Sequence, residues 1–323
     1  MTTVLDIDAL PAGLRFVATV GVFDGVHRGH ARVISVLAAL ARQTSATAVA
    51  ITLEPHPEKV LRGAGPAALS DPAERIERLK ALGAGSVVVQ RFDQAFAAQS
   101  AETFLTRLGL GRHLAGLVMS PESAFGRDRK GTLGRIRTIA AERGFELSEV
   151  PPLEMGDERV SSTRIRQAVE AGHLSAAARL LDRRYAVVGT VVHGDGRGRG
   201  MGYATANLAF AEPVVLPPNG VFAVRVTWGG QGPLTPAHRR DGVASLGVRP
   251  TFEGDGERLL EAHLFDFDGD LYGELLRVEF VRRQRGEKRF GSITSLIRQM
   301  DRDAARARII LAVLPDPPSR VGG

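Results

Sequence analysis

The strongest constraint on the fold of this chain is a change in its hydrophobic rhythm near residue 180. Before that point, short apolar runs alternate with segments of helical spacing. Apolar strands separated by helices are typical of a parallel sheet covered on both faces, so the first half is predicted to be an α/β domain. The predicted strands are 16–20, 46–53, 86–90, 116–119 and 146–149, and the predicted helices are 31–43, 72–82, 101–108 and 132–143.

The second half is β-rich, and Gly and Pro clusters divide its short apolar segments. This spacing predicts a small antiparallel β-barrel, closed by a helix over 292–313. Because 323 residues is about twice a usual domain length, we expect two domains, 1–182 and 183–323. The predicted barrel strands are 186–192, 220–228, 242–245, 259–266 and 275–282.

Composition narrows the chemistry. The chain has no cysteine, so disulfides, thiol catalysis and cysteine-held zinc are excluded, and any metal must be held by oxygen or imidazole. It has neither an apolar run of about 18 residues nor a signal-like start, so we expect a cytoplasmic protein without a membrane partner. The net charge of +6 favours anionic partners. Arginines are scattered and only 6% of residues are aromatic, which favours small phosphorylated ligands over nucleic acid. The oligomeric state is left open.

The segment "GVFDGVHRGH" places His27 and His30 at the start of a predicted helix that follows a strand. Three residues apart on a first turn, both imidazoles face the same way, beside backbone N–H groups that have no intrahelical partner. Such a turn is suited to binding phosphate. Two surface histidines beside a tight turn would give the same spacing.

The same segment resembles the H-x-G-H signature of nucleotidyltransferases. Three further segments, "ITLEPHPEKVL", "RFDQAFAAQSAETFL" and "RVSSTRIRQAVEAGHLSAAARLL", resemble in order the N-terminal module of bacterial bifunctional riboflavin kinase/FMN adenylyltransferases. The resemblance implies a Rossmann-like domain that transfers an adenylyl group from ATP to FMN and releases pyrophosphate, with His27 and His30 as catalytic residues. Ser162 and Thr163 are expected to cap a helix over 165–171 while Arg159 or Arg166 reaches phosphate. The implied nucleotide-binding residues are Gly21, Phe23, Asp24, Gly29, Arg159, Ser162, Thr163 and Arg166.

One segment departs from the family pattern. Where the family carries G-x-[DN]-F-x-F-G, this chain has "SPESAFG", with Glu122 in place of Asp or Asn and Ser123 in place of an aromatic residue. The resemblance assigns Glu122 and Phe125 to the flavin side of the cleft. The departure keeps open an alternative, a monofunctional riboflavin kinase with a degenerate N-terminal domain.

In the second half, "GDGRGRGMG" contains neither G-x-G-x-x-G nor a P-loop. Its glycines allow the backbone to approach a ligand closely. Thr205 and Asn207 follow it, two residues apart on an extended segment, and so offer two oxygens on one face, as Mg²⁺ prefers beside phosphate. A glycine hairpin with Thr and Asn as turn formers is the alternative. We predict that Thr205 and Asn207 bind Mg²⁺ and that the loop cradles ATP phosphates through Gly194, Gly196, Arg197, Gly198 and Arg199.

The stretch also resembles the riboflavin kinase motif G-[FY]-P-T-A-N, with Ala204 in place of Pro. That change loosens the backbone before Thr205 without removing a ligand. A kinase acting on a primary alcohol needs a proton acceptor, and the resemblance assigns this role to Glu261. It also assigns Arg285 and Glu287 to the flavin side, where exposed loop charges are the alternative.

The resemblance therefore implies an enzyme that converts riboflavin to FMN with Mg-ATP and then FMN to FAD. Its small-molecule partners would be ATP, riboflavin and FMN. A non-catalytic binding protein that responds to flavin or nucleotide is the alternative from another functional class.

Overall fold

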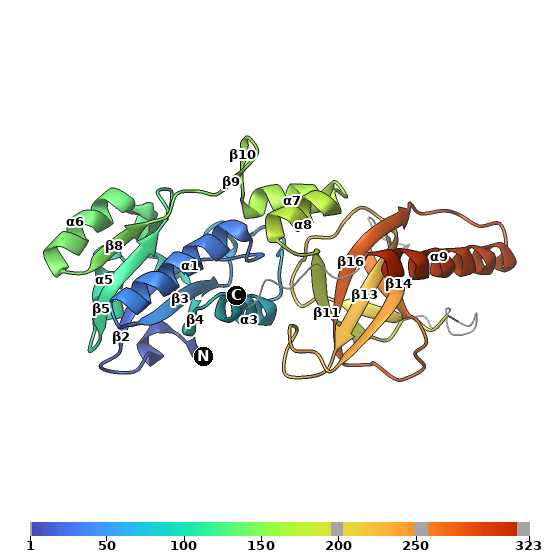
Figure 1. Cartoon of the computed structure of the whole chain (residues 1–323), viewed down its shortest axis with the longest axis horizontal. Coiled ribbons are helices and arrows are strands. Elements are labelled where there is room, and N and C mark those ends of the chain that lie inside the picture. Colours follow the sequence, from blue (N-terminus) through green and yellow to red (C-terminus); the bar gives the residue numbers. More distant parts are fainter. Residues whose placement is uncertain (1, 195–202, 249–257, 315–323) are drawn as a thin grey trace. The chain divides into compact units, whose positions relative to one another are not determined.

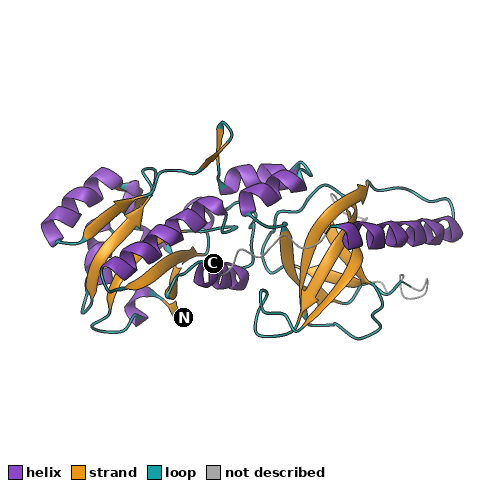
Figure 2. Ribbon diagram, in the orientation of Figure 1, coloured by secondary structure: helices purple, strands orange, loops and turns teal. Residues whose placement is uncertain are grey.

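The computed structural model describes residues 2–194, 203–248 and 258–314. Over these residues the chain folds into two compact units (Figure 1). The first comprises residues 2–66 and 75–161, and the second comprises 67–74 and 162–314. The predicted fold class is confirmed, because the first unit holds a parallel sheet with helices and the second a closed barrel with a terminal helix (Figure 2).

The first unit is built on a six-stranded sheet in the order β1-β4-β3-β2-β5-β8. Every neighbouring pair in this sheet is parallel. The strands are β1 (Thr2–Leu5), β2 (Arg15–Gly21), β3 (Thr47–Glu54), β4 (Ser86–Arg91), β5 (His113–Met119) and β8 (Glu146–Glu149). The helices are α1 (Arg28–Gln43), α2 (Pro57–Arg62), α3 (Pro72–Ala81), α4 (Gln94–Ala97), α5 (Ala101–Gly109) and α6 (Leu133–Arg143), with 3-10 turns at Ile7–Ala9 and Arg127–Arg129.

Helices cover both faces of this sheet. Along β2, Val17 belongs to a buried cluster with residues of α1 and α3, such as Ile34 and Leu79. The neighbouring Phe16 belongs to a separate cluster with α5 and α6 residues, among them Phe104. Successive residues of a strand point to opposite faces, so a central strand covered on both faces is mostly apolar rather than alternating. This is why the continuous apolar runs predicted the strands correctly.

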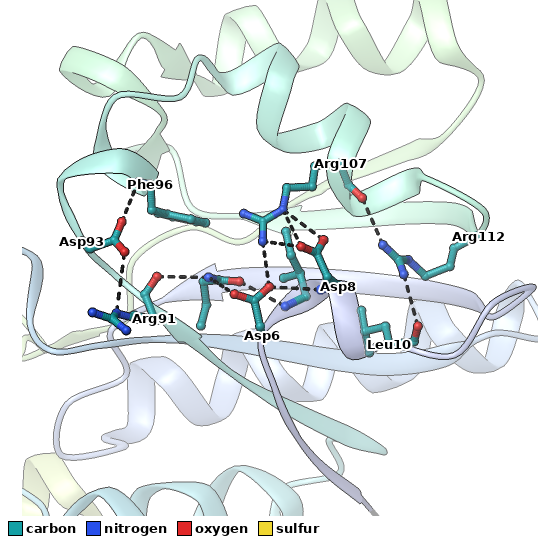
Figure 3. A network of polar contacts seen from close by, with 10 residues as sticks. Asp6, Asp8, Leu10, Arg91, Asp93, Phe96, Arg107 and Arg112 are labelled. Carbon is teal, nitrogen blue, oxygen red and sulfur yellow. Dashed lines mark hydrogen bonds and ion pairs between the residues drawn. The ribbon is translucent and has the colours of Figure 1, made fainter.

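Strand β1 was not predicted, since it is only four residues long and mostly exposed. A charged network holds the adjoining turn to the sheet (Figure 3). The Arg107 guanidinium donates to the carboxylates of Asp6 and Asp8, at 2.9 and 2.6 Å from its Nη2. Gln90 donates to Asp6 and accepts the backbone N–H of Ile7. The hydrogen bonds from Arg107 lower the pKa of Asp8.

The second unit is a six-stranded barrel closed in the order β11-β12-β15-β14-β13-β16, with β11 pairing β16. All its pairs are antiparallel, as predicted. The last three residues of the "YATANL" segment, Ala206 to Leu208, lie in strand β12, and Thr205 immediately precedes it. Among the described helices, none has the length and apolar character needed to span a bilayer. The strands are β11 (Ala186–Val192), β12 (Ala206–Ala209), β13 (Gly220–Trp228), β14 (His238–Val248), β15 (Arg258–Leu264) and β16 (Leu275–Arg285), and the helices are α7 (Ser162–Glu170), α8 (Leu174–Leu181) and α9 (Ile293–Val313).

A short segment from the first half of the sequence belongs to the barrel unit. Residue Ala68 forms a parallel bridge with Val214, and the buried Glu74 pairs with Arg277 of β16 at 3.5 Å. Burial lowers the pKa of Arg277, but the neighbouring Glu74 and Glu279 carboxylates outweigh that effect and raise it. Helices α7 and α8 belong to the barrel unit as well. The predicted domain bounds, 1–182 and 183–323, remain our proposal for the two functional modules of the sequence.

Candidate active sites

The first candidate site lies where the order of the parallel sheet reverses. Strands β3 and β4 follow β2 on one side, whereas β5 and β8 lie on the other side. In open α/β sheets, ligands bind at the carboxyl ends of the strands that flank such a reversal. The turn over 22–27 follows the end of β2, and the "SPESAFG" segment follows the end of the adjacent β5. The topology therefore brings two of the predicted segments to the same edge of the sheet.

His27 and His30 hold each other at the start of α1. His27 is the N-cap residue, and its Nδ1 accepts the backbone N–H of His30 at 3.3 Å. The Nδ1 atom of His30 accepts the backbone N–H of His27 at 3.4 Å, and the two rings stack with centroids 3.6 Å apart. Because each Nδ1 is an acceptor, each neutral ring carries its proton on Nε2. Both imidazoles are thus fixed as Nε2–H donors.

The rest of this turn is tightly packed. A Cβ added at Gly29 would lie 3.1 Å from Nδ1 of His27, and one added at Gly21 would lie 3.2 Å from the Phe23 ring. Phe23 also meets the His30 ring edge-on, with centroids 5.2 Å apart. The two predicted glycines, Phe23 and both histidines therefore form one packed cluster. The remaining predicted turn residue, Asp24, is buried.

Sequence reasoning missed the residues that anchor this turn. Arg75 donates to the carbonyl oxygen of Val22 at 3.0 Å, and Thr52 donates to the same oxygen at 3.1 Å. Arg75 is buried and also pairs with Glu54. A buried arginine needs a partner. The sequence signal was faint, because a charged residue early in a helix usually faces solvent.

The predicted site residues outside the turn contact other protein side chains. Arg159 pairs with Glu122, so a predicted phosphate ligand and a predicted flavin-side residue contact each other. The next residue, Val160, has its carbonyl oxygen 3.7 Å from the position of a Cβ on Gly29, which places this segment beside the histidine turn. Phe125 packs edge-on against Phe104, with ring centroids 5.3 Å apart.

The expected helix cap at Ser162 and Thr163 needs correction. Helix α7 begins at Ser162, earlier than predicted, so both residues lie in the first turn rather than before it. These residues fall in the second unit, together with Arg166. The Nε atom of Arg166 donates to the backbone carbonyl of Ala67 at 2.8 Å.

The second candidate site is a cavity of about 530 Å³ in the barrel unit. The cross-strand register carries the argument, since Asn207 of β12 lies directly opposite Glu261 of β15. Directly opposed residues on antiparallel strands have Cβ atoms about 4.5–5.5 Å apart. The cavity is lined by every predicted kinase-site residue that the structure describes, namely Gly194, Thr205, Asn207, Glu261, Arg285 and Glu287.

Asn207 has the environment of a metal ligand. Its side chain is 6% exposed, and its Oδ1 has no hydrogen-bond partner among the described residues. A Cβ on Gly194 would lie 2.2 Å from Asn207 Nδ2, so only glycine lets the loop backbone approach this amide. A buried orphan oxygen is costly unless a ligand satisfies it. These residues fit Mg²⁺ held together with phosphate oxygens.

The other loop predictions, Gly196, Arg197, Gly198 and Arg199, lie outside the described residues.

On the predicted flavin side, Arg285 and Glu287 are held by residues that sequence reasoning missed. Arg285 donates to the buried Asp303 of α9, at 2.7 Å from Nη2 to Oδ2. Asn219 donates to Glu287 at 3.1 Å. The burial of Asp303 could have been predicted from the sequence, because this residue lies at helical spacing from the apolar Ala307, Ile310 and Leu311. A lone carboxylate on an apolar helix face calls for a buried partner.

Comparison with known proteins identifies a family for each half of the sequence. The FAD synthetase family model matches residues 12–164, and the riboflavin kinase family model matches residues 181–311. The bifunctional riboflavin kinase/FMN adenylyltransferase of Escherichia coli strain K12 is 37% identical over 295 residues, covering 90% of this chain and 91% of the relative. The enzyme of that name from Bacillus subtilis strain 168 is 32% identical, again covering 90% of this chain and 91% of the relative.

One solved structure is also similar over almost its full length. It is described as a macrolide-efflux protein from Streptococcus pneumoniae, and it has a TM-score of 0.81 and 31% sequence identity. The match covers 95% of this chain and 98% of that chain. The family inferred from short motifs is confirmed by these matches along nearly the whole sequence. The chain belongs to the bifunctional riboflavin kinase/FMN adenylyltransferase family.

Proposed function

We propose that the two activities of this family are carried by the two sites described above. The enzyme phosphorylates riboflavin to FMN and adenylylates FMN to FAD. Family membership supports this bifunctional assignment over a monofunctional kinase or a non-catalytic binding protein. We assign phosphorylation to the barrel cavity and adenylylation to the histidine turn.

In the barrel, Glu261 acts as the proton acceptor. It takes the proton of the riboflavin primary hydroxyl as that oxygen forms a bond to the γ-phosphorus of ATP. The bond between the γ-phosphorus and the bridging oxygen breaks, and ADP leaves. Thr205 and Asn207 supply the oxygens that would hold Mg²⁺. When bound, Mg²⁺ neutralises charge on the phosphates.

At the histidine turn, the phosphate of FMN attacks the α-phosphorus of ATP and pyrophosphate leaves. The Nε2–H groups of His27 and His30 donate to the α-phosphate oxygens as their charge grows in the transition state. The reciprocal cap supports this role, because it fixes both tautomers and both ring orientations before substrate arrives.

The observation that carries the kinase assignment is the register of β12 against β15. It pairs Asn207, whose amide oxygen has no hydrogen-bond partner among the described residues, with Glu261 on the neighbouring strand, and both residues line one cavity. A metal-bound phosphate and a proton acceptor must lie side by side for in-line transfer. The register supports this assignment, because it holds Asn207 and Glu261 side by side on neighbouring strands.

Reciprocal variants test the assignment. Glu261→Ala and Glu261→Gln should each lower the rate of riboflavin phosphorylation by about 10²-fold to 10⁴-fold, with FMN adenylylation close to wild type. The double variant His27→Ala/His30→Ala should abolish pyrophosphate release from ATP and FMN while riboflavin phosphorylation continues. Both rates are measured on each purified protein. Undiminished FMN formation in Glu261→Gln would remove Glu261 as the base, and unchanged pyrophosphate release would remove both histidines.

A further inference from the structure

The segment that leads into Thr205 lacks the proline of the family motif, yet the structure provides other restraints on it. The carbonyl oxygen of Ala204 lies 2.8 Å from Nδ1 of His263. A carbonyl oxygen can only accept, so Nδ1 of His263 donates. His263 follows Glu261 by two positions on β15, and both side chains line the cavity. The strand that carries the proposed base therefore also holds the backbone beside Thr205.

Tyr203 restrains the same segment from its other end. Its hydroxyl donates to Asp301 of α9, and its ring lies 4.8 Å from the ring of His263. Asp301 precedes Asp303, which holds Arg285 on the flavin side.

We propose that Tyr203 and His263 are positioning residues that fix the backbone at Ala204 and so aim the Thr205 oxygen at the proposed magnesium site. This inference rests on the proposed function, in which Thr205 is a metal ligand. Tyr203 connects the segment to α9, and His263 connects it to β15. Together they replace the rigidity that a proline at position 204 would supply by restricting φ. The class of ligand affected is the Mg-ATP complex.

Steady-state kinetics of riboflavin phosphorylation, with riboflavin, ATP and Mg²⁺ varied separately, test this role. His263→Leu removes the donor and should raise the KM for Mg-ATP and the Mg²⁺ concentration for half-maximal rate by about fivefold to tenfold. The KM for riboflavin should change by less than about twofold. His263→Asn is the rescue variant, because its amide nitrogen takes the place of ring Nδ1, and it should recover most of the wild-type Mg²⁺ dependence.

The role of the hydrogen bond between Tyr203 and Asp301 is tested by a double-mutant cycle. Tyr203→Phe and Asp301→Ala should each raise the Mg²⁺ requirement by about threefold to tenfold, and the double variant should be no worse than the more impaired single variant. Asp301→Asn keeps an acceptor and should stay near wild type. Additive effects of the two single substitutions would show that the hydrogen bond does not position the segment, and would overturn the proposed role of Tyr203.

Controls separate this inference from the proposed function. His238→Leu alters an exposed histidine of β14 and should leave all constants unchanged. Thermal unfolding followed by circular dichroism reports whether each variant stays folded. Thr205→Ala should raise the Mg²⁺ requirement at least as much as His263→Leu. If Thr205→Ala has no effect, the proposed magnesium site fails. If Thr205→Ala acts but His263→Leu and Tyr203→Phe match His238→Leu, the positioning role alone is overturned.

Discussion

The two candidate centres of this chain are built in contrasting ways. At the N-terminal turn, His27 and His30 lie within one helical turn and satisfy each other's backbone donors. In the barrel, Asn207 and Glu261 come from strands far apart in the sequence and meet only through their register. The comparison teaches that the first geometry is encoded locally, whereas the second depends on the whole barrel closing correctly.

The largest effect is expected where the barrel centre has an amide oxygen with no partner among the described residues. Asn207→Ala removes that oxygen and should lower riboflavin phosphorylation by about 10³-fold, since metal charge stabilisation is worth several kcal/mol. FMN adenylylation should not change. Asn207→Asp keeps a metal-binding oxygen and should retain more activity than Asn207→Ala. Equal rates for the Ala variant and wild type would show that the amide is not a ligand.

At the N-terminal histidine turn, substitutions of His27 can separate its effect on stability from its effect on catalysis. Asn is a good N-cap, so His27→Asn should preserve the start of α1 while removing the Nε2 donor. Pyrophosphate release should fall by about 10²-fold with unfolding free energy nearly unchanged. His27→Ala should show a similar fall in pyrophosphate release, and its unfolding free energy should also drop by about 1 kcal/mol. Wild-type adenylylation in His27→Asn would mean that the ring serves only as a cap. The readouts are pyrophosphate release and circular dichroism in denaturant.

The dependence of the barrel centre on close backbone approach is tested at Gly194. A Cβ there would lie 2.2 Å from Asn207 Nδ2, so Gly194→Ala must displace either the loop or the amide. Overpacking of this kind costs about 1–3 kcal/mol, and we expect about a tenfold fall in riboflavin phosphorylation. Gly291→Ala is the matched control in the same unit, because no atom of the described residues lies within 4 Å of its added Cβ, apart from its chain neighbours. Equal rates for the two variants would contradict the close packing of the loop.

The smallest expected effect concerns the stability of the turn that follows β1. Arg107→Gln breaks the network with Asp6 and Asp8 and should destabilise β1 by at most about 1 kcal/mol, because these exposed charges are screened by solvent. The folded-state pKa of Asp8 is lowered, so its contribution is present above the unfolded pKa and is lost as pH falls through the folded value. Amide exchange at Ile7 should therefore differ between wild type and variant at neutral pH, and the difference should shrink below about pH 4. A pH-independent difference would rule out the charge contribution.

The sequence predicted those parts of the fold whose signal is local. Continuous apolar runs predicted the central strands, and a first-turn spacing predicted that His27 and His30 face one site. It missed β1, because the strand is only four residues long and mostly exposed, and contacts distant in the sequence fix the adjoining turn: the charged network and the burial of Ile7. The reciprocal histidine cap could not be predicted either, since a histidine ring has several partners to choose from.

In the barrel, motif residues were predictable but their supports were not. Nothing in the spacing of Arg285 or Tyr203 points to α9, because these contacts depend on where the terminal helix packs. The exception is Asp303, a carboxylate on an apolar helix face. Register was also beyond the sequence, since a shift of one residue would move Asn207 to the other face of the sheet.

The most direct test of the central claim is a crystal structure of the chain with ADP and Mn²⁺, which replaces Mg²⁺ and can be located by its anomalous scattering. We expect the ion to lie within about 2.0–2.2 Å of Thr205 Oγ1 and Asn207 Oδ1, in the barrel cavity beside Glu261. An ion bound to ADP but remote from both side chains would contradict it.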